Sequence, residues 1–293
     1  MMDTSFDNKA FRDDVLTNLQ NALVMGVYTV VRDGLKYKLS EEDNNIVEII
    51  GLDNYDFEGN EGVLHLAGAD KVAKGAFSFI DAITEVEGYD IIAIDKDAFL
   101  KCNNLVKVNL PKVKELGESS LAYNFKLTSV DAPECVELKS EALACCFTLS
   151  SLNLPKLETC KSRVFKSCYN LTEVEFDNLT DIGVGLFKDC INLIKVRLRN
   201  FEGYSMSETF KGCKNLKIVE LPKAKAISDD TFIGAEEIEE IIAPKIIIRD
   251  DVVASLKHLC VLYISYISKG DSYDRAEEPT FIKENCIKKY CKL

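Results

Sequence analysis

FLKCNNLVKVNLP, residues 99–111, is the stretch that decides the fold, because it returns in the same pattern as FKGCKNLKIVELP at residues 210–222. Its first residue belongs to a column of phenylalanine or leucine that recurs every 22 residues, with one residue added before the last two members: Phe77, Phe99, Leu121, Leu143, Phe165, Phe187, Phe210 and Phe232. More apolar residues follow each member at +3, +6, +9, +11, +14 and +17. A unit of this length cannot bury its own apolar face, so successive units must stack into a solenoid with one continuous core.

Each unit carries one clear strand signal. The apolar residues at +9 and +11 are separated by a polar or outward-facing residue, which is the pattern of a short strand with one buried face. Proline often follows this strand, where it ends pairing because it donates no ladder hydrogen bond. We therefore predict nine to ten units that form a curved parallel β-sheet, each closed by an irregular turn and a short helix that carries the +0 and +3 residues.

The solenoid is expected to occupy residues 55–264, between two regions of different pattern. Residues 1–54 are predicted to form an N-terminal cap, with an amphipathic helix over residues 7–25 and short strands over 27–31, 35–39 and 46–50. Residues 265–293 leave the repeat and are predicted to form a loop and a short helix that begins at Pro279. Terminal segments of this kind shield the ends of a stacked core.

The composition is that of a globular protein, with 47% hydrophobic and 29% charged residues. A formal charge of -12 argues against a nucleic-acid partner, because phosphate binding needs a concentrated basic surface. No segment is apolar over the 18 or more residues that a membrane span requires. The apolar stretch at residues 22–31 is preceded by several aspartates and makes a poor signal peptide. We therefore expect a cytoplasmic location, with a surface or secreted protein as the alternative.

Most of the eleven cysteines fall on core columns rather than in a disulfide framework. The +3 column holds five of them: Cys102, Cys146, Cys168, Cys190 and Cys213. A small thiol suits an inward-facing position in a tight turn, so we interpret these residues as buried free cysteines in a reducing compartment. The alternative is that stacked neighbours, such as Cys168 and Cys190, oxidise to a disulfide. Two histidines and no Cys-x-x-Cys pair give no support to a zinc site.

The repeated pattern Phe-x-x-Cys-x-Asn-Leu-x-x-Val-x-Leu-Pro, seen from Phe99 to Pro111 and from Phe210 to Pro222, resembles the BspA-like, treponemal-type class of leucine-rich repeats. The resemblance extends over residues 55–264. It implies a leucine-rich repeat solenoid and a role in protein binding or adhesion, since members of this class are typically surface or secreted proteins of bacteria and some protists. No catalytic residues come with the repeat.

The residues at +8, +10 and +12 are expected to face solvent, opposite the buried +9 and +11 residues. Among them, opposite charges occupy two successive units: Glu173, Glu175 and Asp177 precede Lys195, Arg197 and Arg199. One interpretation is an exposed ladder of ion pairs that contributes little to stability. The other is a docking site for a protein of complementary charge. The remaining candidate partner-binding residues are Glu85, Glu87, Tyr89, Ile218, Glu220 and Ile242.

No pattern of catalytic residues accompanies this surface. The chain has no phosphate-binding glycine loop, no Gly-x-Ser-x-Gly and no His-Glu-x-x-His. We therefore predict a non-catalytic protein-interaction module with no cofactor and no metal, or alternatively a surface or secreted adhesin that binds host protein or glycan. The identity of the partner and the oligomeric state are left open by the sequence.

Overall fold

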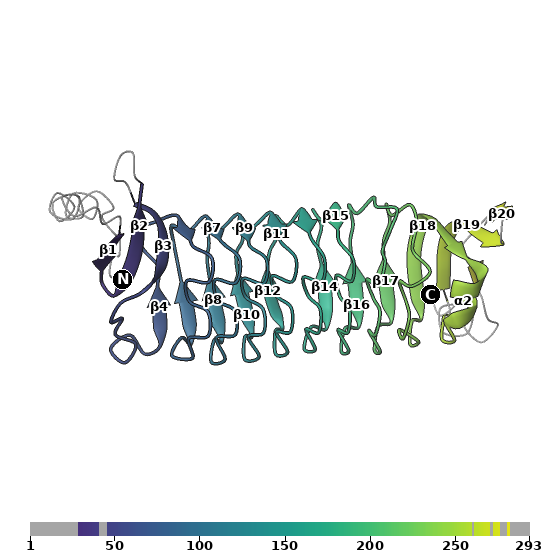
Figure 1. Ribbon diagram of the computed structural model, residues 1–293. Coiled ribbons are helices and arrows are strands. Elements are labelled where there is room, and N and C mark those ends of the chain that lie inside the picture. The colour runs from purple at the N-terminus through teal and green to yellow at the C-terminus, as the bar shows by residue number, and fades with distance from the viewer. Residues whose placement is uncertain (1–28, 41–45, 260, 270–271, 276–279, 282–293) are drawn as a thin grey trace, which may run out of the picture.

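The computed structural model describes residues 29–40, 46–259, 261–269, 272–275 and 280–281. These residues form one continuous solenoid of short stacked turns, which runs from the strands near the N-terminus to those near the C-terminus (Figure 1). The helix predicted over residues 7–25 lies outside the described residues.

The strand predicted in each unit is present and contains the +9 residue. These strands are β4 Val63–His65, β6 Glu85–Glu87, β8 Lys107–Asn109, β10 Ser129–Asp131, β12 Ser151–Asn153, β14 Glu173–Glu175, β16 Lys195–Arg197, β17 Ile218–Glu220 and β18 Glu240–Arg249. Except for β12 and β14, successive strands pair in parallel with the same columns opposite one another, as Val130 does with Val108. The 22-residue period therefore sets the register.

Each of the first six turns also contributes a second strand, which the sequence analysis did not predict. These two-residue strands are β5 Lys71–Val72, β7 Ala93–Ile94, β9 Glu115–Leu116, β11 Glu137–Leu138, β13 Thr159–Cys160 and β15 Asp181–Ile182. They form a separate parallel sheet, whose +17 residues reach into the core. The turns thus stack through two sheets rather than one.

The predicted short helix at +0 and +3 is replaced by consecutive tight turns in every described unit. In the seven units that start from residue 77 to residue 210, the residues two before and two after the +0 position have left-handed backbone, for example Arg163 with φ 57° and Ser167 with φ 58°. Two left-handed residues so close together cannot continue a right-handed helix. Instead, the Phe165 amide donates to the Leu186 carbonyl of the next turn at 3.0 Å, so hydrogen bonds here also run along the stack.

The core consists of the repeated columns lying above one another. Phenylalanines of the +0 column stack with ring centroids 5.6 Å apart for Phe165 and Phe187, and 6.0 Å apart for Phe187 and Phe210. The +3 cysteines are buried beside them, and each thiol donates to the +0 carbonyl of the preceding turn, as Cys190 does to Phe165 at 3.0 Å. All eight cysteines in the described residues are free. The predicted packing role of this column is confirmed for those residues.

The N-terminal strands match the prediction closely. They are β1 Thr29–Arg32, β2 Leu35–Leu39 and β3 Ile46–Leu52, which pair antiparallel with one another and extend the sheet of two-residue strands beyond β5. Asp33 and Gly34 both have positive φ, as the tight turn between β1 and β2 requires.

At the other end, β18 is followed by a helix, α2 Asp250–Ser255, and by β19 Val261–Lys269. Antiparallel β20 Ser272–Arg275 and β21 Thr280–Phe281 pair with β19. The helix predicted from Pro279 is therefore wrong at residues 280–281, where pairing with β19 makes the chain extended. Its remaining residues lie outside the described part of the chain.

Candidate functional site

The charged strand residues meet on β14, β16 and β17, which are neighbours in one parallel sheet. Their central residues, Val174, Val196 and Val219, are buried, and the residues on either side face outward. The register places Glu173 beside Lys195 and Glu175 beside Arg197. The two predicted charge stripes are thus adjacent, and Glu220 lies on the far side of Arg197.

Every cation of this group has an ion-pair partner within it. Arg197 lies between two carboxylates, with Nη1 3.1 Å from Glu175 Oε1 and Nη2 3.0 Å from Glu220 Oε1. Arg199 Nη2 is 2.7 Å from Glu175 Oε1, and its Nε is 3.1 Å from Asp177 Oδ1. Lys195 Nζ is 2.9 Å from Glu220 Oε1, so Lys195 forms its ion pair with Glu220 and not with Glu173, which lies beside it on β14. We call these seven residues the charge ladder: Glu173, Glu175, Asp177, Lys195, Arg197, Arg199 and Glu220.

The charge ladder therefore alternates negative, positive and negative across three strands. Hydrogen bonds from Arg197, and then from Lys195, hold the pKa of Glu220 below its ordinary value. The same carboxylate, followed by Glu175, raises the pKa of Arg197. Both shifts favour the charged forms of Glu220 and Arg197. Glu173 differs from the others, because its exposed carboxylate has no ion pair or hydrogen bond within the described residues.

The other candidate residues do not join this group. Glu85 and Glu87 lie on β6, which is separated from the charge ladder by β8, β10 and β12. They pair locally, Glu85 with Lys107 at 3.4 Å and Glu87 with His65 at 3.3 Å. Tyr89 follows them and is 56% exposed.

Two candidate isoleucines lie next to the charge ladder. Ile218 on β17 pairs with Lys195 on one side and with Glu240 on the other, and Ile242 on β18 pairs with Glu220. Both side chains are only half-buried. These two isoleucines therefore form a small apolar border next to the charge ladder, on the side nearer the C-terminus.

The structure also contains a feature of this sheet that the sequence analysis missed. The sheet of three-residue strands is interrupted between β12 and β14, which lie on successive turns but do not pair (Figure 1). A cavity of about 250 Å³ occupies the interruption. We call this place the strand break, and it is lined by Ser150, Ser151, Leu152, Leu171, Glu173, Val174, Glu175 and Phe176. The only sequence signal is Phe176, the one aromatic residue in the +11 column.

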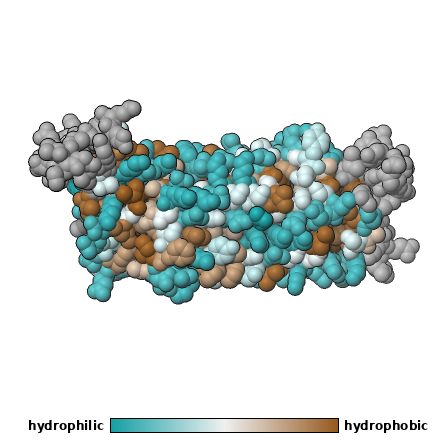
Figure 2. Space-filling model, viewed as in Figure 1, coloured by the Kyte–Doolittle hydropathy of each residue, from teal (hydrophilic) through white to brown (hydrophobic). Residues whose placement is uncertain are grey.

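A second missed feature is a column of aromatic rings on the turns, four residues after the +0 position. Phe125 stacks on Phe147 with centroids 4.8 Å apart, and Phe147 stacks on Tyr169 at 4.7 Å. Phe147 therefore has both ring faces covered by its neighbours, and the stacked faces of Phe125 and Tyr169 are covered as well. The column stabilises the turns rather than offering a flat stacking platform. Figure 2 shows apolar residues scattered among hydrophilic ones on the face in view, not gathered into one continuous patch.

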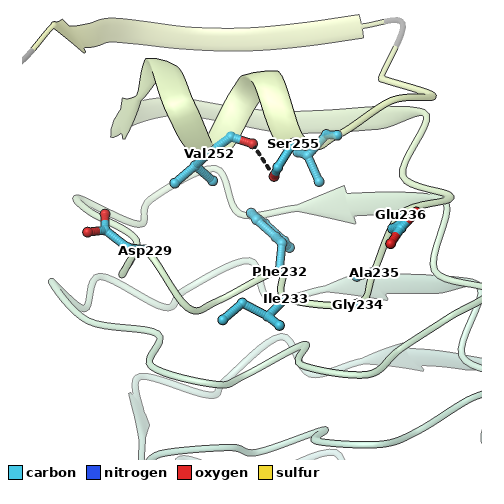
Figure 3. A pocket seen from close by; sticks show the side chains of 9 residues that line it. Asp229, Phe232, Ile233, Gly234, Ala235, Glu236, Val252 and Ser255 are labelled. Carbon is cyan, nitrogen blue, oxygen red and sulfur yellow. Dashed lines mark hydrogen bonds between the residues drawn. The ribbon is translucent and has the colours of Figure 1, made fainter.

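Another cavity, of about 230 Å³, lies between the last full turn and α2 (Figure 3). Phe232 and Val252 reach into it, whereas the carboxylates of Asp229 and Glu236 lie at opposite ends. The Ser255 hydroxyl donates to the Val252 carbonyl at 2.6 Å, so it is held by the backbone and has no base beside it. This lining has no nucleophile paired with a general base.

The described residues offer little other chemistry. No group of three or more potential metal ligands occurs there. Burial raises the pKa of the Cys102 thiol to about 11 and those of Cys146 and Cys213 to about 12, which keeps these thiols protonated and unreactive. No helix in the described part of the chain is both long and apolar enough to cross a membrane.

The model of the BspA type leucine rich repeat region matches six copies in this chain, over residues 70–194 and 136–256. A crystal structure of a T. pallidum leucine rich repeat protein is similar to the fold, with 20% identity, a TM-score of 0.52, and coverage of 78% of this chain and 95% of that one. A leucine rich cell surface protein from Faecalibacterium prausnitzii gives 15% identity and a TM-score of 0.35, covering 83% of this chain and 95% of its own. A leucine-rich repeat protein from Bacteroides ovatus gives 17% identity and a TM-score of 0.36, with coverage of 83% and 89%. Comparison with curated proteins gives no match.

Proposed function

The chain belongs to the BspA type leucine-rich repeat family, and from this premise we propose that it is a non-catalytic module that binds a protein partner through the solvent-facing residues of β14, β16 and β17. Repeat solenoids of this kind commonly serve as protein-interaction scaffolds. The observation that carries the choice of surface is the charge ladder, in which seven charged side chains on or just after three neighbouring strands present negative, positive and negative charge in turn.

The ladder suits recognition better than it suits stability. Exposed ion pairs contribute little to folding, because water and salt screen them and two long side chains must be held in place. Across an interface, the same charges guide encounter and reject partners of the wrong pattern. A partner that presents a basic group to Glu173 and an acidic group near Arg199 would extend the alternation already present. Ile218 and Ile242 would then supply apolar contact at the margin.

The test reverses the positive stripe. A triple variant with Lys195→Glu, Arg197→Glu and Arg199→Glu should fold with a small loss of stability and lose capture of the partner from the native cell, measured by crosslinking and mass spectrometry. The matched control reverses three lysines elsewhere on the stack, Lys114, Lys139 and Lys156, which changes the net charge equally. The control should retain capture. Undiminished capture by a correctly folded triple variant would refute the docking site.

We also propose that the protein acts in a reducing compartment, as a cytoplasmic protein would. The eight described cysteines are free thiols, and seven of them are buried among core side chains. Mass spectrometry of the native protein after alkylation without reductant should find these thiols intact. Disulfides at these positions, or detection of the protein outside the cell, would favour the adhesin alternative instead.

A further inference from the structure

The strand break interrupts a ladder of hydrogen bonds that is otherwise regular. On its two sides, the Ser150 amide donates to the Thr128 carbonyl at 3.1 Å, and the Ile194 amide donates to the Thr172 carbonyl at 2.7 Å. The equivalent bond from Thr172 to Ser150 is missing among the described residues, and so is the bond from Leu154 to Glu175. Both edges of the break therefore have backbone donors and acceptors without a strand opposite them.

The break has a local cause in packing. The +11 position holds leucine in the turns on either side, Leu154 and Leu198, but phenylalanine at Phe176. The Phe176 ring stacks on Phe165 with centroids 5.8 Å apart, in addition to the stacking of Phe165 on Phe187. The extra ring volume holds β14 away from β12, since a close-packed core cannot absorb an added ring without moving its neighbours.

Exposure of the core confirms that the break is open. Val174 is 5% and Phe176 6% exposed, whereas Val130 and Val196, in the same column as Val174, are 1% and 0% exposed. Leu152, also in that column, is only partly buried. The sheet of two-residue strands remains closed at the same turns, because Thr159 pairs with Asp181. The stack is thus opened on one side and held together on the other.

We propose that the strand break binds an extended segment of a protein partner, which adds its backbone to the edge of β14 or β12, places an apolar side chain in the cavity and presents Lys or Arg to Glu173. Extended peptides bind sheet edges in this way, with main-chain hydrogen bonds giving affinity and alternate side chains giving specificity. Glu173 supplies the charge preference, because its carboxylate faces the break without a partner in the described residues. The inference deepens the proposed function by assigning a partner segment to the same sheet.

The chain itself suggests a defined probe. On its other edge, β14 pairs with β16, whose sequence places Lys195 beside Glu173 and Arg197 beside Glu175. A labelled synthetic peptide copying residues 193–199, LIKVRLR, therefore carries the alternation that β14 already accepts. Two control peptides separate charge from backbone pairing: LIEVELE reverses the charges, and LIKPRLR removes one backbone donor.

The matched protein variant is Phe176→Leu, which restores the residue found in neighbouring turns at +11 and should let β12 and β14 pair. Binding is measured by fluorescence anisotropy, and closure by hydrogen exchange of the Leu154 and Thr172 amides. We expect the native protein to bind LIKVRLR at least about tenfold more tightly than either control peptide. Phe176→Leu should slow exchange at both amides and abolish binding.

Three results would overturn the inference: no binding of LIKVRLR, equal binding of the acidic peptide, or undiminished binding by a Phe176→Leu protein whose two amides have become protected. Failure of the proposed function is seen separately. The triple variant with Lys195, Arg197 and Arg199 changed to glutamate leaves Phe176 and Glu173 in place. If this variant no longer captures the partner but still binds the LIKVRLR peptide, the charge ladder and the strand break are independent contact sites. If the Phe176→Leu protein loses peptide binding but still captures the partner, the strand break is refuted as a contact site for that partner, while the charge ladder is not.

Discussion

At the scale of single residues, the +3 column shows why cysteine recurs in this chain. Its thiol is small enough for the turn and donates to the +0 carbonyl of the preceding turn, at 3.2 Å from Cys168 to Leu143 and 3.0 Å from Cys213 to Phe187. The sequence predicted burial and packing for these residues. The hydrogen bond could not be predicted, because it depends on how closely successive turns approach one another.

Among the units without cysteine at +3, the one that holds asparagine has a consequence for stability. Asn124 is buried at +3, and its Nδ2 donates to the Phe99 carbonyl at 3.0 Å and to the Leu121 carbonyl at 2.8 Å. Its Oδ1 is buried and lacks a hydrogen-bond partner within the described structure. A buried acceptor left without a partner is destabilising.

We therefore expect Asn124→Cys to raise the free energy of unfolding by about 1 kcal/mol, because it keeps a donor to Phe99 and removes the unpaired oxygen. Urea denaturation of the two proteins measures the difference. The reciprocal variant, Cys146→Asn, should be less stable than the native protein. A loss of stability in Asn124→Cys would contradict this account.

At the scale of elements, the sequence predicted the strand at +9 and +11 well, because its apolar and outward-facing residues alternate in nearly every copy. The second strand of the first six turns was not predicted, because it is only two residues long and contributes one inward-facing side chain, such as Leu116 or Leu138. No alternation can be recognised in so short a segment. The same holds for the strand break, which depends on the contact of Phe176 with Phe165 rather than on any local pattern.

The candidate site was also predicted in part: the sequence indicated which charged residues lie on neighbouring strands, but not which of them form ion pairs. Alternation placed Glu175 and Arg197 on the solvent side, and the period placed them on neighbouring strands. The sequence did not indicate that Lys195 would contact Glu220 instead of Glu173, because the choice between the two neighbouring strands depends on side-chain geometry. That choice is what leaves Glu173 facing the break.

Close approach of successive turns makes a further prediction at Gly117, just after β9. A Cβ added there would lie 2.6 Å from the Asp95 carbonyl carbon and 2.7 Å from the Lys96 nitrogen. Both are backbone atoms, so relief requires that two turns move apart. We expect Gly117→Ala to lower the free energy of unfolding by about 1–3 kcal/mol, measured by urea denaturation. Glu118→Ala, which changes an exposed side chain next to it, is the control and should have a much smaller effect. Equal effects would show that the turns are not tightly held at Gly117.

At the scale of the whole molecule, stability is the sum of contacts between neighbouring turns. The structure provides three kinds of link along the stack: two ladders of strands, the backbone bonds between tight turns, and exposed ion pairs that join successive turns. Glu134 joins three turns, with Lys114 at 2.8 Å and Lys156 at 2.5 Å. Glu208 accepts from Lys188 at 2.7 Å and from Lys211 at 2.5 Å.

These links predict how the stack responds to acid. Hydrogen bonds from Lys114 and Lys156 lower the pKa of Glu134 to about 2, and those from Lys188 and Lys211 lower the pKa of Glu208 to about 2, from an ordinary value of 4.5. A carboxyl whose pKa is lower in the folded state stabilises the protein above its unfolded pKa, and this contribution is lost as pH falls through the folded value. The contribution of both residues is therefore complete above about pH 5 and disappears between pH 4.5 and pH 2.

The double variant Glu134→Gln and Glu208→Gln should consequently melt at a slightly lower temperature than the native protein at pH 7, because exposed ion pairs contribute little each. The difference in melting temperature should narrow from pH 4.5 downward until the two proteins coincide near pH 2. Circular dichroism melting across this range measures it. Because both carboxylates are exposed to salt, the gap at pH 7 should also shrink in 1 M NaCl. A gap that stays constant from pH 7 to pH 2 would mean that the lost stability comes from the shape of the glutamine side chains and not from charge, so that ion pairs do not link the turns.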